Sequence, residues 1–205
     1  LGDQGVTVLW RPLHESNGGW FWYCTTQGSN TLDPSYLQRM WIYIYDYYVN
    51  ELGLTNLIWN YGPNTSSNVD DNKGSTMSPW YCYPGDEYVD MVGVDWYTSN
   101  GEEITNGDNY LGLIDITRKI GAVTEFGPAG ALIVAEGTKP QEELFNCMDL
   151  YGIIFDLQRE GYNFTYFLTW GGKWGLGAMG RGDEFMKSDI VITRSELKTM
   201  FDAMK

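Results

Sequence analysis

The chain has 205 residues, of which 43% are hydrophobic and 20% charged, a balance typical of one folded domain rather than of a disordered segment. Thirteen basic against 27 acidic residues give a formal net charge of −14, which argues against a nucleic-acid partner because phosphate backbones require clustered Lys and Arg. No apolar run approaches the roughly 20 residues that a membrane helix needs, so we expect no membrane insertion.

The first part of the chain predicts a strand, a helix and a second strand. Residues 6–13 (VTVLWRPL) have the composition of a buried strand. Asp33 then predicts a helix N-cap with Pro34 at the first helical position, and the helical pattern runs to Gly53, a good C-terminal stop. Residues 56–64 (NLIWNYGPN) predict the second strand.

The rest of the chain continues this alternation. After a short helical turn at YPGDEY, the predicted elements are a strand at 90–97, a helix at 110–119, a strand at 120–127, an amphipathic helix at 141–160, a strand at 164–172 and a closing helix that begins at Ser195. All five strands are apolar in both alternating phases, as expected for parallel strands covered on both sides.

Alternating strands and helices leave two architectures, an open doubly wound sheet or part of a (β/α)8 barrel. No GxGxxG or Walker-type loop follows any strand, which weakens the nucleotide-binding alternative. Polar and aromatic residues collect instead at the C-terminal strand ends, where a barrel builds its active site: Glu15, Asn60, Tyr97, Glu125 and Trp170. We therefore predict an α/β fold in which residues 1–205 form part of a single barrel domain.

Two carboxylates finish predicted strands, Glu15 after RPLH and Glu125 in AVTEFG. Hydrolysis of a glycosidic bond needs one protonated carboxyl group and one ionised carboxylate, and two glutamates on rigid strand ends can supply both. Either glutamate alone would be interpreted as an exposed loop charge. The two together, each within an apolar run, make the catalytic interpretation as strong as the interpretation as loop charges. Several of the 9 Trp, 15 Tyr and 8 Phe fall in glycine-rich loops, where exposed rings can stack on sugars.

Five stretches resemble glycoside hydrolase family 26, in the order that the family has them. RPLHESNGGWFW resembles its acid/base motif, and the others are NLIWNYGPN, YPGDEYVDMVGVDWY, TEFG and FLTWGG. The resemblance covers nearly the whole chain and implies a retaining (β/α)8 TIM-barrel hydrolase, in most members an endo-β-1,4-mannanase. It also implies that the chain carries barrel strands four to eight and that an N-terminal barrel segment of the same protein is missing. We expect a barrel opened in this way to be poorly stable and weakly active or inactive alone.

The resemblance implies catalytic roles for both glutamates. Glu15 would be the general acid/base at the end of the fourth barrel strand, and Glu125 the nucleophile at the end of the seventh. Arg11 would either keep Glu125 ionised or only brace the barrel interior. A strictly alternating strand could not send both His14 and Glu15 inward, so we expect a bend or bulge at this strand end.

Four further residues are implied to bind or position the substrate. His14 would hydrogen-bond to substrate or help orient the acid/base, and Tyr97 would hydrogen-bond to the nucleophile. Trp20 and Trp170 are similar to the walls on which sugars stack beside the cleavage point.

The sequence thus predicts a retaining glycoside hydrolase that cleaves β-1,4-mannosidic bonds in mannan or glucomannan outside the cell, with no metal or organic cofactor. Two alternatives stay open: a β-1,3-1,4-glucanase or β-1,3-xylanase on the same scaffold, and a non-catalytic carbohydrate-binding protein. Ser16 and the Tyr23–Cys24 pair depart from the family pattern and leave the exact substrate open. Cys24 and Cys82 lie in predicted loops and could form a disulfide if the protein is secreted. No cysteine or histidine spacing predicts a metal site.

Overall fold

The five predicted strands and the helices between them occur in the predicted order, and the structure adds two short strands at residues 26–27 and 30–31 and a short helix at Gly182–Met186 that the sequence did not predict. The structure, a computed structural model, describes residues 1–24, 26–27, 30–31, 33–65, 77–98, 110–128, 149–171, 174–176 and 181–204. The strands are β1 (Val8–Trp10), β2 (Thr26–Gln27), β3 (Asn30–Thr31), β4 (Leu57–Tyr61), β5 (Met91–Thr98), β6 (Ile120–Pro128) and β7 (Phe167–Thr169). The α-helices are α1 (Ser35–Asp46), α2 (Tyr110–Thr117), α5 (Leu150–Arg159), α6 (Gly182–Met186) and α7 (Arg194–Ala203). Shorter helical segments are η1 (Gly2–Gln4), η2 (Tyr47–Glu51) and η3 (Asp86–Tyr88).

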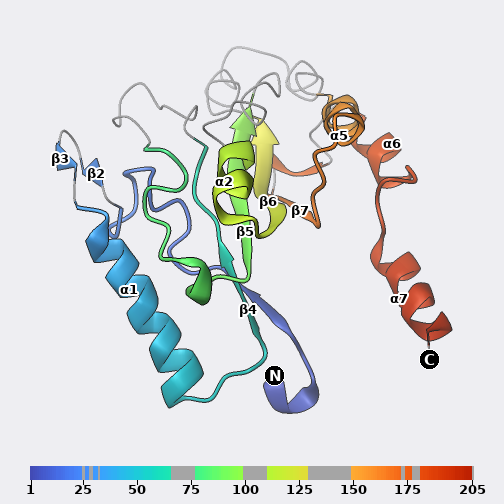
Figure 1. The fold of residues 1–205 in the computed structure, drawn as a ribbon. Helices are drawn as coiled ribbons and strands as arrows, with labels where there is room; N and C mark the ends of the chain where they lie inside the picture. The colour runs from blue at the N-terminus through green and yellow to red at the C-terminus, as the bar shows by residue number, and fades with distance from the viewer. Residues whose placement is uncertain are drawn as a thin grey trace.

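The main sheet has the strand order β1-β4-β5-β6-β7, and every neighbouring pair in it is parallel. Within this sheet each strand pairs with the next one along the chain, and the order never reverses, whereas β2 and β3 form a separate antiparallel pair. A doubly wound sheet needs such a reversal, so the sheet belongs to the other architecture, a partial (β/α) barrel. The predicted fold class is confirmed. Figure 1 shows α1 to one side of these strands and α2 in front of β5 and β6.

The core is aromatic where α1 meets the sheet. The indole of Trp41 on α1 packs edge-on against Trp59 and Tyr61 of β4, with ring centroids 6.0 and 5.8 Å apart. The helix begins at Ser35 with Pro34 as its N-cap, one residue later than predicted, and the Asp33 carboxylate accepts a hydrogen bond of 2.9 Å from the Ser35 N–H. It continues through η2 and stops at Gly53, whose φ of +64° is a conformation that favours glycine.

The first strand is shorter than predicted, because β1 ends at Trp10 and a turn follows. Leu13 and Glu15 have φ values of +50° and +51°, an unusual conformation for residues that have a Cβ. Two backbone hydrogen bonds of 2.9 Å hold this turn, from the Glu15 N–H to Gly62 O and from the Gly18 N–H to Glu15 O. The bend that we expected at this strand end is therefore a left-handed turn.

Elements near the C-terminus differ from the prediction in their limits. Strand β7 is shorter than the predicted strand at 164–172, and α5 matches the second half of the predicted helix at 141–160. The first half of that predicted helix lies outside the described residues. Helix α7 begins one residue before Ser195, since Thr193 and Glu196 form a capping box.

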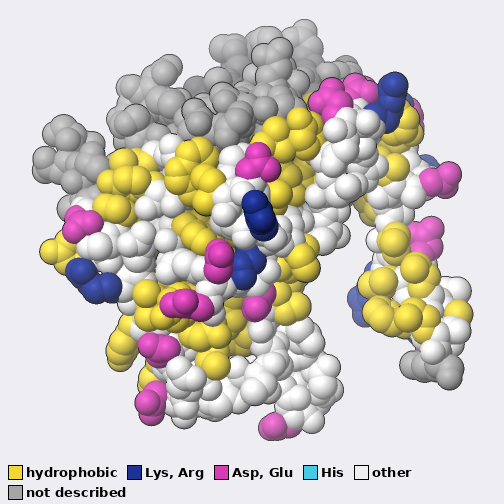
Figure 2. Space-filling model, viewed as in Figure 1, with side chains coloured by type: hydrophobic (Ala, Val, Ile, Leu, Met, Phe, Trp, Pro, Cys, Tyr) yellow, Lys and Arg dark blue, Asp and Glu magenta, His cyan; other side chains and the backbone are white. Residues whose placement is uncertain are grey.

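Helix α7 stands away from the sheet and presents hydrophobic side chains to solvent (Figures 1 and 2). Four exposed residues repeat at helical spacing along it: Leu197, Met200, Phe201 and Met204. None of the described helices is long and apolar enough to cross a membrane. Cys24 and Cys82 are both buried and are not joined by a disulfide in the structure.

Candidate active site

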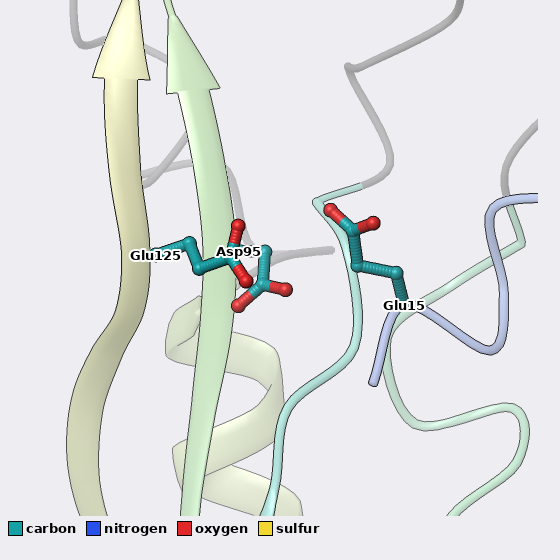
Figure 3. A group of neighbouring side chains, drawn as sticks. All are labelled: Glu15, Asp95 and Glu125. Carbon is teal, nitrogen blue, oxygen red and sulfur yellow. The ribbon is translucent and has the colours of Figure 1, made fainter. Parts of the chain in front are cut away.

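Three buried carboxyl groups converge on one side of the sheet. Glu15 comes from the turn after β1, Asp95 from β5 and Glu125 from β6, and Figure 3 shows their carboxyl groups directed toward a common region. One oxygen of each lies within 4.8 Å of an oxygen of the other two. Because carboxylates this close repel one another, the cluster needs a cation or a proton to be stable.

The cation is Arg11, one residue beyond β1. Its Nη1 donates to both carboxylate oxygens of Asp95 at 2.6 and 2.7 Å, and its Nη2 donates to Oε1 of Glu125 at 2.5 Å. Burial lowers the pKa of Arg11, but the two carboxylates outweigh burial and raise it, so the guanidinium stays charged. The same side chain therefore contacts Glu125 and ties β5 to the end of β1.

A register shift between β5 and β6 places two of the carboxyl groups side by side. Val94 lies opposite Val123, whereas the next residue, Asp95, lies opposite Glu125. Thr124 is thus an extra residue on β6, and its hydroxyl donates a hydrogen bond of 2.6 Å to Oδ1 of Asp95. The bulge directs both Thr124 and Glu125 toward Asp95, which regular alternation along a strand would not allow.

Both oxygens of Glu125 accept hydrogen bonds. Arg11 donates to Oε1, and the hydroxyl of Tyr97 donates to Oε2 at 2.8 Å. Burial, and then the hydrogen bond to Glu125, raise the pKa of Tyr97, so the phenol keeps its proton and remains a donor. A charged donor and a neutral donor thus fix the two oxygens of Glu125 in place.

Glu15 has a different environment, although it too is held at both oxygens. Trp20 Nε1 donates to Oε2 at 2.7 Å, and Asn64 Nδ2 donates to Oε1 at 2.9 Å. Burial raises the pKa of Glu15, and the nearby charge of Glu125 adds to this effect. The two hydrogen bonds and Arg11 oppose the rise without cancelling it. Glu15 is therefore biased toward its protonated form, while Glu125 accepts hydrogen bonds from Arg11 and Tyr97.

Comparison with known proteins places this arrangement in a family. The sequence profile of glycosyl hydrolase family 26 matches residues 1–175. The chain belongs to glycosyl hydrolase family 26. A mannan endo-1,4-beta-mannosidase of Bacillus subtilis is 34% identical over 173 residues, which are 83% of this chain and 41% of that protein. Mannan endo-1,4-beta-mannosidase A and B of Caldalkalibacillus mannanilyticus is 31% identical over 96% of this chain and 34% of its own length.

Solved structures agree with this assignment. A Bacillus subtilis mannanase superimposes with a TM-score of 0.71 at 28% identity, over 91% of this chain and 48% of that one. A β-mannanase from a symbiotic protist of the termite Reticulitermes speratus, solved with a gluco-manno-oligosaccharide, gives 0.61 at 27% identity over 96% of this chain and 50% of its own. This family 26 chain spans about half the length of these solved relatives. It spans less than half the length of the curated ones.

Among the binding residues implied by the family resemblance, Tyr97 and Trp20 contact the two glutamates directly, whereas His14 and Trp170 do not. The ring of His14 packs on Phe21 with centroids 4.8 Å apart, and its hydrogen bonds are to Tyr23 rather than to Glu15. Burial, and then the charge of Arg11, lower the pKa of His14, which favours the neutral imidazole. Trp170 follows β7 and is 51% exposed.

Trp20 differs from the expected sugar-stacking wall in one respect, because its indole N–H is engaged with the Glu15 carboxyl group. Asn60, predicted at the same end of the sheet, is fully buried and donates to the hydroxyl of Tyr166 at 2.5 Å. It supports the interior beside the carboxyl cluster and does not contact the cluster.

Three polar residues of the site were missed from sequence: Asn17, Asn64 and Asp95. Asp95 had a signal, since it is the carboxylate within the apolar strand VGVDWY and a buried charge in a strand needs a partner. Asn17 and Asn64 lie within the family-like stretches RPLHESNGGWFW and NLIWNYGPN, which was a signal, but asparagine is common in loops and neither was assigned a role.

The three carboxyl groups could also ligate a metal ion by distance alone, since one oxygen of each lies within 4.8 Å of the others. Asp95 and Glu125, however, already share the guanidinium of Arg11. A metal ion would have to displace this internal cation from both, so the arrangement is that of an ion-paired carboxylate cluster.

Proposed function

We propose that this chain is the catalytic part of a retaining glycoside hydrolase that cleaves β-1,4-mannosidic bonds. The observation that carries the proposal is the separation of the two glutamates, since oxygens of Glu15 and Glu125 lie within 4.8 Å. Retaining enzymes hold their carboxyl groups about 5–5.5 Å apart, whereas inverting enzymes need about 6.5–9.5 Å to admit a water molecule. The short separation supports direct attack by one glutamate.

In the first step of the proposed mechanism, Glu15 protonates the glycosidic oxygen while Glu125 attacks the anomeric carbon. The raised pKa of Glu15 keeps a proton available for the leaving group. Arg11 and Tyr97 each hold one oxygen of Glu125, which orients the attacking lone pair.

In the second step, Glu15 removes a proton from water, and that water releases the sugar from Glu125. The same group serves as acid and then as base because it has just lost its proton in the first step. Two carboxyl groups and water complete the reaction, so the proposed mechanism uses no metal or organic cofactor.

We propose mannan or glucomannan as the substrate, because several similar proteins are named mannan endo-1,4-beta-mannosidases. Such polymers are too large to enter a cell intact, so we propose extracellular action. A β-glucan is the second candidate, since Endoglucanase H of Acetivibrio thermocellus is 32% identical over 94 residues. The activity proposed is that of a complete barrel, which includes the half of the relatives that this chain does not match.

The test is an assay of the complete protein on mannan, lichenan and β-1,3-xylan, with reducing ends counted over time. We expect mannan to be preferred and the first product to keep the β configuration when followed by ¹H NMR. Glu125→Ala should abolish hydrolysis. An inverted first product, or full activity in Glu125→Ala, would contradict the mechanism, and preference for lichenan or xylan would contradict the substrate.

A further inference from the structure

We infer that Asn64 is a positioning residue for the Glu15 carboxyl group and that Asn17 locks Asn64 in place. The inference rests on the acid/base role proposed above for Glu15. Both asparagines lie within stretches that resemble the family, Asn17 in RPLHESNGGWFW and Asn64 at the end of NLIWNYGPN, but the sequence assigned no role to either. Both are almost completely buried, at 0% exposure for Asn17 and 2% for Asn64.

Asn64 lies three residues beyond β4, in a segment that touches both sides of the site. Its Nδ2 donates to Oε1 of Glu15 at 2.9 Å. On the other side, the segment pairs with β5, since Asp95 N–H donates to Pro63 O at 2.8 Å and Thr65 N–H donates to Asp95 O at 3.1 Å. Asn64, which holds the Glu15 carboxyl group, is thus fixed to β5. Asp95 of the same strand holds Arg11.

Asn17 fixes the backbone of Asn64 from the opposite direction. Its Oδ1 accepts from the Asn64 N–H at 2.8 Å, and its Nδ2 donates to Asn64 O at 2.8 Å. The second proton on Nδ2 goes to Met77 O at 2.7 Å. Both donors and the carbonyl of the Asn17 amide are therefore engaged, and the backbone of Asn64 has little freedom to shift.

The consequence for Glu15 is geometric and electrostatic. Trp20 and Asn64 each hold one carboxyl oxygen, so the plane of the group cannot rotate away from its neighbour Glu125. Both donors also favour the ionised form, against burial. Asn64 thereby keeps Glu15 able to release its proton in the first step and to act as a base in the second.

Other charged or titratable groups also act on Glu15, from the turn after β1 and from β5 and β6. They are Arg11, Tyr23, Asp95, Tyr97 and Glu125. Asn64→Ala leaves all of them in place and keeps the backbone hydrogen bonds to Asn17. A change in the titration of Glu15 in this variant is therefore assigned to the lost side-chain amide.

The experiment compares Asn64→Ala, Asn64→Asp and Asn17→Ala with the wild type, each in the complete protein. Titration of Glu15 is followed by ¹³C NMR of protein with labelled glutamate carboxyls, and Glu15→Gln identifies its signal. The pH profile of kcat/KM on a manno-oligosaccharide is recorded in parallel. Asn50→Ala is the matched control, because the exposed Asn50 amide donates to the Asp46 carboxylate at 3.0 Å, away from the site.

We expect the pKa of Glu15 to rise by about one unit in Asn64→Ala, because a hydrogen bond to the charged form has been removed. The alkaline limb of kcat/KM should move to higher pH by a similar amount, and kcat should fall roughly tenfold or more with KM little changed. Asn64→Asp preserves the side-chain shape but adds a like charge, so it should raise the pKa further. Asn17→Ala should shift it in the same direction.

An unchanged Glu15 titration in both Asn64 variants would overturn the inference, whatever happens to activity. An equal shift in Asn50→Ala would do the same. If the wild type hydrolyses no glycan while Glu15 still shifts in Asn64→Ala, the proposed function fails, yet the control of Glu15 by Asn64 is supported. The two failures are therefore distinguishable.

Discussion

The hydroxyl of Tyr97 donates a hydrogen bond of 2.8 Å to Oε2 of Glu125, across the pair formed by β5 and β6. The phenol lies 28 residues before this glutamate in the chain, and the parallel pairing of the two strands brings them together. Since Arg11 holds the other oxygen, the proposed nucleophile is fixed by two donors on separate elements.

Tyr97→Phe tests this contact, because phenylalanine keeps the ring and removes the donor. A hydrogen bond to a charged group contributes about 1.5–3 kcal/mol, so kcat should fall about 10- to 100-fold. Steady-state kinetics on a manno-oligosaccharide measure the effect. Tyr83→Phe is the matched control, since the Tyr83 hydroxyl donates to Asp86 at the surface. Equal losses in both variants would contradict a specific role for Tyr97.

Removal of Arg11 should destabilise the protein. Arg11→Met leaves Asp95 and Glu125 buried without their shared cation, and loss of one partner from a buried ion pair costs about 3–5 kcal/mol. Urea unfolding measures the change, with the exposed Arg39→Met as the control. Arg11→Lys should recover only part of the stability, because one ammonium cannot reproduce the guanidinium fork. Full stability in Arg11→Met would show that the cluster does not need the cation.

Gly62 provides the space that Arg11 occupies. A Cβ at this position would lie 2.7 Å from Cδ of Arg11, so Gly62→Ala should push the guanidinium away from its carboxylates. We expect destabilisation of about 1–3 kcal/mol together with reduced kcat. Gly171→Ala serves as the control, since no heavy atom of the described residues lies within 4 Å of its added Cβ. The explanation fails if Gly62→Ala behaves like Gly171→Ala in thermal unfolding and in activity.

The raised pKa of Glu15 predicts how stability changes with pH. Between its ordinary value of 4.5 and its raised value in the fold, the folded state keeps a proton that the unfolded state loses. The contribution of Glu15 to stability is therefore present below this range and is lost as pH rises through it. Glu15→Gln does not titrate, so its free energy of unfolding should fall less over the same range. Parallel curves for the two proteins from urea unfolding would contradict a raised pKa.

The fold was predictable because its strands are apolar in both phases and its helix ends carry clear signals. Gly53 marked the end of the first helical segment, and the Asp33–Pro34 pair marked its start to within one residue. The end of β1 was not predictable, since a left-handed turn at Leu13 and Glu15 contradicts the preferences of both residues. Tertiary hydrogen bonds, such as the one to Gly62 O, determine the turn.

The candidate site was predictable only in part. Glu15 and Glu125 could be found because they occur as a pair at the ends of apolar strands and because their motifs resemble those of the family. The contact of Asn64 with Glu15 joins residues 49 apart in the chain, and it depends on how the two loops meet. The bulge at Thr124 likewise depends on strand register, which a local pattern does not specify.

At Glu15 the left-handed backbone favours glycine for stability, whereas the proposed chemistry requires a carboxyl group. Glycine adopts a φ of +51° freely, whereas a residue with a Cβ is disfavoured there by about 1–2 kcal/mol. A population selected for stability alone would therefore drift toward glycine at position 15, and it would lose the carboxyl group. Under the proposed acid/base role, the carboxyl group outweighs this cost, and glycine at this position would indicate a relative that has lost the role.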